Sequence, residues 1–171
     1  MTRADVVIRP EQPGDHAGVA SLLKAAFGGA VEAGLVERLR NDDDIVRALV
    51  AVSEKGAVVG YVAFPRLRLT GGDRDRPAVG VAPLAVCPAS QKNGIGSALM
   101  TAGLEWLRQQ GELLVFVLGD PAYYARFGFE LSAAEPFISE YAGPYFMALA
   151  LQPDAPAEGR LIYPSAFADP G

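Results

Sequence analysis

The segment QKNGIGSALM, Gln91 to Met100, places two glycines directly before an apolar pattern of helical spacing. A short apolar run precedes it, so the segment is expected to connect a strand to a helix. The first N–H groups of a helix have no partner within it, and Gly94 and Gly96 would let a phosphate approach them closely. The segment therefore predicts a phosphate or pyrophosphate site, although a bare GxG pattern also occurs in tight turns that bind nothing.

Apolar periodicity on both sides of this segment predicts an α/β fold. Strands are expected at 6–10, 47–53, 57–64, 78–86, 113–118 and 145–151, and helices at 15–27, 31–40, 94–110 and 120–127. The three runs between residues 47 and 86 should form sequential antiparallel strands, and the continuously apolar run 113–118 should be central in the sheet. Helices should cover this sheet of mixed strand directions.

Less regular patterns lie at two helix starts and near the C-terminus. Asp15 and Asp120 are expected to be N-caps. The segment 132–144 should be an irregular insert, the run 145–151 the last strand, and the Pro-rich tail 152–171 should lie against the surface. We expect a single domain over residues 1–171, with a core from about 5 to 151.

The composition excludes several classes of protein. With 20 acidic and 15 basic residues among 171, the formal net charge of −5 disfavours a nucleic-acid partner. Cys87 is the only cysteine, so no internal disulfide can form. The first ten residues lack the apolar core of a signal peptide, and no apolar run approaches the roughly 18 residues of a membrane span. We expect a cytoplasmic protein without a nucleic-acid or membrane partner.

Two other glycine-rich phosphate loops fit the segment less well. A dinucleotide-binding fingerprint would have a third glycine where Leu99 stands. A Walker loop requires Gly-Lys followed by Ser or Thr, which this segment lacks. A nucleotide-binding domain of the dehydrogenase type is therefore disfavoured.

Three motifs in this order resemble the GNAT superfamily of N-acetyltransferases: PLAVCP at 83–88, Gln91-x-x-Gly94-x-Gly96, and Tyr124-x-x-x-Gly128-Phe129. Through GVAPLAV, NGIGSAL and LGDPAYYARFGFE the chain is most similar to the bacterial YhbS-like N-acetyltransferases. The resemblance extends from residue 6 to about 151 and is weakest in the insert and the tail. It implies a mixed, mostly antiparallel central sheet that is splayed in the middle and flanked by helices.

The resemblance also implies acetyl-CoA as co-substrate and no metal ion. The pyrophosphate would bind the loop 91–97, and the pantetheine arm would bind the backbone of strand residues 84–86, in the gap beside the run 113–118. The implied cofactor-binding residues are Leu84, Ala85, Val86, Gln91, Lys92, Asn93, Gly94, Ile95, Gly96 and Ser97.

The loop departs from the family pattern at three positions. Ser90 stands where relatives often have an aromatic residue or Arg, and Lys92-Asn93 where Gly followed by a basic residue is common. Asn93 tolerates a left-handed backbone, and Lys92 could still meet a phosphate. We expect altered affinity rather than loss of binding.

The resemblance assigns direct attack of an amine on the thioester, without a covalent enzyme intermediate. Tyr124 would protonate the departing thiolate, since tyrosine, with an ordinary pKa of about 10, keeps its proton at neutral pH. The alternative is a packing aromatic, as we expect for Tyr123. Glu32 is a candidate base for the amine, and its alternative role is that of a solvated acid in the first turn of a helix.

Other reactive or aromatic side chains have simpler roles. Cys87 has no neighbouring histidine in the sequence to activate it, so we expect a packing residue. His16, the only histidine, is expected at the surface. Phe137, Tyr141 and Tyr145 could line the acceptor pocket or form a small core within the insert.

The sequence therefore predicts an acetyl-CoA-dependent N-acetyltransferase that acts on an amine of a small molecule, a peptide or a protein. The alternative is a non-catalytic acyl-CoA-binding sensor or interaction module on the same fold. Segments 28–40 and 132–145 should build the acceptor pocket, whose ligand the sequence does not define. A homodimer is compatible with the sequence.

Overall fold

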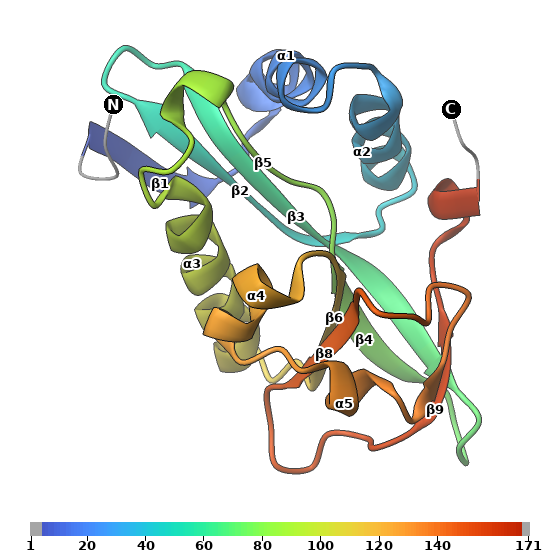
Figure 1. Ribbon diagram of the computed structural model, residues 1–171. Helices are drawn as coiled ribbons and strands as arrows, with labels where there is room; N and C mark the ends of the chain where they lie inside the picture. Colours follow the sequence, from blue (N-terminus) through green and yellow to red (C-terminus); the bar gives the residue numbers. More distant parts are fainter. Residues whose placement is uncertain (1–4, 169–171) are drawn as a thin grey trace.

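The computed structural model describes residues 5–168, so the ends of the predicted domain, 1–4 and 169–171, lie outside the described part. Its strands form one nine-stranded sheet whose main path runs in the order β1-β2-β3-β4-β6-β8 (Figure 1). The strands are β1 (Val6–Pro10), β2 (Ile45–Ser53), β3 (Val58–Thr70), β4 (Arg76–Val81), β5 (Leu84–Val86), β6 (Leu114–Leu118), β7 (Phe137–Ile138), β8 (Phe146–Ala150) and β9 (Gly159–Ile162).

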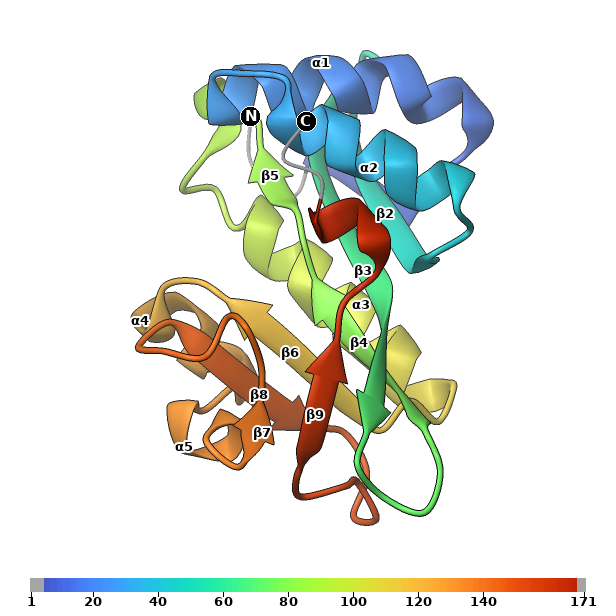
Figure 2. The same ribbon diagram turned by 90° about the vertical axis from the view of Figure 1, so that its right-hand side faces the viewer.

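Helices cover both faces of the sheet, as the apolar periodicity predicts. The longer helices are α1 (His16–Phe27), α2 (Val31–Asn41) and α3 (Ile95–Gln109), and the short ones are α4 (Pro121–Tyr124) and α5 (Leu131–Ala134). Helices α1 and α2 pack over one face, where Leu23 and Tyr61 are buried, and α3 packs over the other, where Phe64 and Leu99 are buried (Figure 2). The predicted α/β fold is confirmed.

Strand directions are mixed but mostly antiparallel. Strand β3 is the longest and pairs antiparallel with β2, β4, β5 and β9. Parallel pairing occurs between β4 and β6 and between β7 and β9. Strand β6 has β4 on one side and β8 on the other, so its predicted interior position is confirmed.

The predicted strand 78–86 is two strands, and their separation opens the sheet. Strand β4 pairs with β3 at Arg66–Leu69, whereas β5 pairs with β3 at Gly60–Val62. A cis peptide bond joins Ala82 to Pro83 between them. Because β6 accompanies β4 and not β5, the two sides of the sheet diverge beyond this point (Figure 2). This divergence is the splay that the family resemblance implies.

The C-terminal tail contributes a strand, so the prediction that 145–151 is the last strand is wrong. Strand β9 pairs with β3 at Arg68–Thr70 and with β7. Leu161 is buried in the same cluster as Phe116 and Phe137. Four residues between proline-containing segments are too short a signal for periodicity to reveal. The predicted insert is likewise partly regular, because it contains most of α5 and the whole of β7.

The two predicted N-caps have different outcomes. The Asp120 carboxylate accepts a hydrogen bond from the Ala122 N–H at 3.0 Å, as an N-cap should. The Asp15 side chain does not cap α1 but accepts bonds of 2.7 and 3.0 Å from the Arg9 guanidinium. This arginine lowers the pKa of Asp15 below its usual value. This ion pair joins the end of β1 to the start of α1. The sequence alone does not show that the two ends lie together.

No helix within residues 5–168 has both the length and the apolarity required to cross a membrane. Helix α3 instead buries its apolar face on the sheet. At Gly103 the helix lies against Phe64 of β3, because a Cβ atom built there would overlap Cε2 and Cζ of that ring. The absence of a side chain at this position sets the distance between the helix and the strand.

We predict that Gly103→Ala lowers the free energy of unfolding by about 1–3 kcal/mol, because overpacking displaces the buried Phe64 ring. Gly34→Ala in α2 is the matched control, since its Cβ would meet only the flexible end of Arg38. Chemical denaturation of both variants measures the difference. A Gly103→Ala variant as stable as Gly34→Ala would contradict this account of the α3 packing.

Candidate active site

The loop between β5 and α3 forms one wall of a surface cavity of about 570 Å³. Gly94 is the N-cap of α3 and has a left-handed backbone, φ 81°, which glycine adopts without a steric penalty. Ala98 donates to the Gly94 carbonyl, so the N–H groups of residues 95–97 precede the first bond of the helix. The cavity is lined by Val86, Gln91, Lys92, Gly94, Ile95, Gly96, Ser97, Tyr123 and Arg126.

Strand β5 has one paired edge and one open edge among the described residues, because β3 is its only strand partner there. Cys87 donates to the Val59 carbonyl and the Pro83 carbonyl accepts from Ala63, so alternate residues of this segment face β3. The backbone groups of Leu84 and Val86 therefore point the other way. Gln91 confirms this direction, since its Nε2 donates to the Val86 carbonyl at 3.0 Å.

Helix α4 and the 3₁₀ helix η4 (Ala125–Phe127) bring Tyr123 and Arg126 to the same cavity. A Cβ atom on Gly96 would lie 2.9 Å from the Tyr123 hydroxyl, so the cavity narrows there and leaves no room for a side chain. The Arg126 guanidinium stacks 4.6 Å from the centre of the Tyr123 ring. Sequence reasoning missed both residues, although their spacing of three in one helical segment places them on the same face.

Tyr124 lies on the other side of this segment, packed at the divergence of the sheet. A Cβ atom on Gly119, the residue after β6, would be 2.5 Å from Cε2 of Tyr124, so the ring lies against that backbone. Its ring makes edge contacts with Tyr123 and Phe129 at 5.0 and 5.9 Å. Burial, and to a lesser degree Tyr123, raises the pKa of Tyr124 to about 12, so the phenol is protonated at neutral pH.

Three comparisons with known proteins agree with this geometry. The family described as an acetyltransferase (GNAT) domain matches residues 7–132. The chain belongs to the GNAT family of acetyltransferases. It is 43% identical over 128 residues to the N-acetyltransferase YhbS of Escherichia coli K12, covering 75% of each chain. It is 38% identical over 133 residues to YjhQ of the same strain, covering 77% of this chain and 71% of YjhQ.

Two solved GNAT structures are similar over nearly the full chain. The E. coli YhbS structure in complex with CoA has a TM-score of 0.89 and 37% identity, with 98% of this chain and 94% of that chain covered. A GNAT acetyltransferase from Brucella melitensis in complex with acetyl-CoA has a TM-score of 0.80 and 34% identity, covering 95% and 97%. The family and its mostly antiparallel sheet exclude the dehydrogenase-type alternative.

The structure shows the conformation and contacts of the three loop residues that the sequence analysis singled out as departures, Ser90, Lys92 and Asn93. Lys92, which stands where glycine is common, adopts a left-handed backbone with φ 69°. Asn93, which would tolerate this conformation, does not adopt it. Ser90 is buried, and its N–H donates to the Cys87 carbonyl, so it shapes the turn outside the cavity lining. Lys92 thus has a backbone conformation that usually favours glycine.

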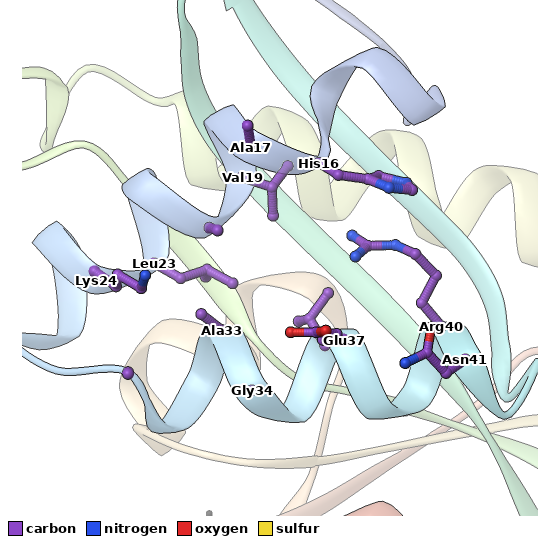
Figure 3. Close-up of a pocket in the computed structure, with 13 residues that line it drawn as sticks. His16, Ala17, Val19, Leu23, Lys24, Ala33, Gly34, Glu37, Arg40 and Asn41 are labelled. Atoms are coloured by element: carbon purple, nitrogen blue, oxygen red, sulfur yellow. The ribbon is translucent and has the colours of Figure 1, made fainter.

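Glu32 lies in the first turn of α2, partly exposed, and does not line the phosphate-loop cavity. It is also absent from the lining of a larger groove of about 580 Å³ between α1 and α2. In that groove, His16 and Arg40 lie at one end and Lys24 at the other (Figure 3). The groove contains neither Tyr124 nor any residue of the loop, so it is separate from the candidate active site.

The remaining side chains singled out in the sequence lie in different environments. Phe137 is buried against Phe116, with ring centres 5.0 Å apart, and belongs to the core. Tyr145 is 59% exposed. Tyr141 lines a small apolar cavity beside the end of β6. Cys87 is half-buried and packs against the apolar clusters of both faces, which confirms its packing role.

We predict that Lys92→Gly is more stable than Lys92→Ala by about 1 kcal/mol, because only the Cβ-bearing residue is penalised in the left-handed region. Both variants remove the same charge, so the comparison isolates the backbone. Denaturant titration of the pair measures it. Equal stabilities would show that residue 92 has a different backbone conformation in solution.

Proposed function

We propose that the protein is an acetyl-CoA-dependent N-acetyltransferase that moves the acetyl group by direct attack of an amine. The observation that carries this proposal is the convergence of three features at the divergence of the sheet: the start of α3, the open edge of β5, and the half-buried ring of Tyr124. The CoA and acetyl-CoA complexes of the two similar GNAT structures support the same ligand.

The loop fits a pyrophosphate by its shape and its charge. Gly94 and Gly96 place no side chain of their own over the N–H groups of the first α3 turn, where a phosphate would bind. Lys92 and Arg126 are the charged residues that line this cavity, and both are cationic in a protein of net charge −5. We assign the phosphate contacts to these groups together with Gln91, Asn93, Ile95 and Ser97.

The edge of β5 fits the amide-bearing arm of the cofactor, which can pair with a strand. The backbone groups of Leu84 and Val86 would bond the arm, whereas Ala85 holds β5 on β3 by pairing with Tyr61. Gln91 occupies the Val86 carbonyl, which leaves the Val86 N–H as the donor nearest the loop. We assign that N–H to the thioester oxygen, where a preorganised donor stabilises developing negative charge.

Acetyl-CoA supplies an activated acetyl thioester. The acceptor nitrogen forms the new C–N bond while the C–S bond breaks. Tyr124 donates its phenolic proton to the departing sulfur, and its raised pKa keeps that proton available at neutral pH. The proton lost by the amine passes to a carboxylate or to a water chain, and Glu32 remains the candidate carboxylate.

We predict that titration calorimetry shows saturable, micromolar binding of acetyl-CoA and no binding of NAD. Arg126→Ala should weaken acetyl-CoA binding about tenfold, the effect of losing one charge-assisted contact. Arg74→Ala, in the exposed turn between β3 and β4, is the matched control and should leave binding unchanged. Absence of acetyl-CoA binding to the wild-type protein would overturn the proposed function.

We predict that Tyr124→Phe lowers kcat about 100-fold or more, the usual contribution of a general acid, without changing the affinity for acetyl-CoA. Thiol release with excess amine measures kcat, and Tyr145→Phe, at an exposed ring, is the control. Unchanged turnover in Tyr124→Phe would remove the assignment of the acid. Binding of acetyl-CoA without transfer to any amine would instead favour the non-catalytic sensor.

A further inference from the structure

The small apolar cavity that Tyr141 lines has a volume of about 190 Å³ and lies beside the sheet divergence. Its floor includes Val81 and Ala82, at the end of β4, and Leu118, at the end of β6. Leu118 precedes Gly119, against which the Tyr124 ring packs. This cavity, which we call the aromatic cavity, therefore reaches the point where β5 and β6 separate.

The aromatic cavity and the phosphate-loop cavity lie on opposite faces of the sheet. Phe116 lines the aromatic cavity and belongs to the cluster that also contains Phe137 and Leu161. The phosphate-loop cavity is lined in part by Ile95, which belongs to the cluster beneath α3. An acetyl group delivered along β5 from the α3 side would thus face an acceptor that enters from the side of the aromatic cavity. This arrangement rests on the proposed function.

Rings from two distant segments wall the aromatic cavity. Tyr141 comes from the insert, and Tyr163 and Phe167 come from the tail beyond β9. The three rings are in edge-to-face contact, with centres 4.7 Å apart for Tyr141 and Tyr163 and 5.3 Å for Tyr163 and Phe167. The tail is held in place by the β9 pairing and by a bond of 3.4 Å from Arg38 to the Ala166 carbonyl.

The lining of the aromatic cavity carries no charge. None of the described residues that form it is acidic or basic. Burial, and to a lesser degree Tyr141 and Glu140, raises the pKa of Tyr163, so its phenol is neutral at physiological pH. The hydroxyls of Tyr141 and Tyr163 are the polar side-chain groups of this lining, too few to replace the hydrogen bonds to water that a charged or hydroxyl-rich acceptor would lose. An apolar group would be stabilised by contact with the rings and by the removal of its surface from water.

We propose that the aromatic cavity selects the acceptor, and that the acceptor is a primary amine of a small molecule with an aryl or branched-alkyl group one or two carbons from the nitrogen. The cavity is comparable in size to the roughly 150 Å³ apolar cavity that holds benzene in an engineered protein. The ring or alkyl group occupies the cavity while the nitrogen points toward the divergence of the strands. In the transfer step the nitrogen bonds to the acetyl carbon and loses a proton to base, and the thiolate leaves with the proton of Tyr124.

The test compares 2-phenylethylamine and 3-methylbutylamine with ethanolamine and putrescine. We expect kcat/KM for thiol release to be at least about tenfold higher for the two apolar amines, a difference of the size that apolar pockets provide. Saturation-transfer NMR on the CoA-loaded protein measures amine binding independently of turnover. It should detect 2-phenylethylamine and not ethanolamine.

Two variants change the cavity in opposite ways. Phe167→Ala removes a wall and should raise KM for 2-phenylethylamine about tenfold, with kcat nearly unchanged. Gly80→Ala adds a methyl group to the cavity at ordinary contact distances of 3.4 Å from Leu67 and Pro65, so it should fold normally and also raise KM for that amine. Ile138→Ala, an exposed apolar residue of β7 outside the cavity lining, should have no effect.

Outcomes for the cavity and for the proposed function are separable. If acetyl-CoA binds but the polar amines bind or react as well as the apolar ones, the acceptor assignment is overturned while the function stands. Failure of 2-phenylethylamine to bind the CoA-loaded protein, or equal effects of Phe167→Ala on all four amines, would also overturn it. Failure of acetyl-CoA to bind removes the function on which the assignment rests.

Discussion

The parallel pairing of β4 and β6 ends after three residues, Val79–Val81 with Val115–Val117, and this limit organises the molecule. Beyond it, β5 remains on β3 while β6 continues with β8. A sheet that stayed closed would satisfy the backbone of β5 with another strand and leave no open edge. Helix α3, Tyr124 and the aromatic cavity are all arranged around the resulting opening. The order and pairing of the strands therefore create the opening, and the side chains of the candidate active site are arranged around it.

The local elements could be predicted from the sequence because their signals are local. The helices α1, α2 and α3, the loop at Gly94 and the cap at Asp120 each depend on residues close together in the chain. The two strands in 78–86 could not be told apart, because their separation depends on which parts of β3 they meet. Strand β9 was missed for the same reason, since only β3 and β7 make its four residues a strand.

The site was predictable to the extent that motifs describe it. Motif spacing pointed to the loop that lines the cavity and to Tyr124 beside the sheet divergence. It did not reveal Tyr123 and Arg126, whose place in the cavity depends on how α4 and η4 fold back toward Gly96. Nor did it reveal Tyr163 and Phe167, because their position depends on β9. The roles that we assign to Tyr124 and Glu32 stay predictions until variants are measured.

The tail that carries Tyr163 and Phe167 lies beyond residue 132, where the match to the GNAT family ends. It reaches the opening through β9, on the face opposite α3, and it shares no residue with the phosphate-loop cavity. Substitutions in this tail can therefore alter one end of the opening while the other end keeps its shape. On the proposed function, affinity for acetyl-CoA and choice of acceptor depend on different segments of one small fold. Evolution can then change the acceptor by substitutions in the tail without rebuilding the cofactor site.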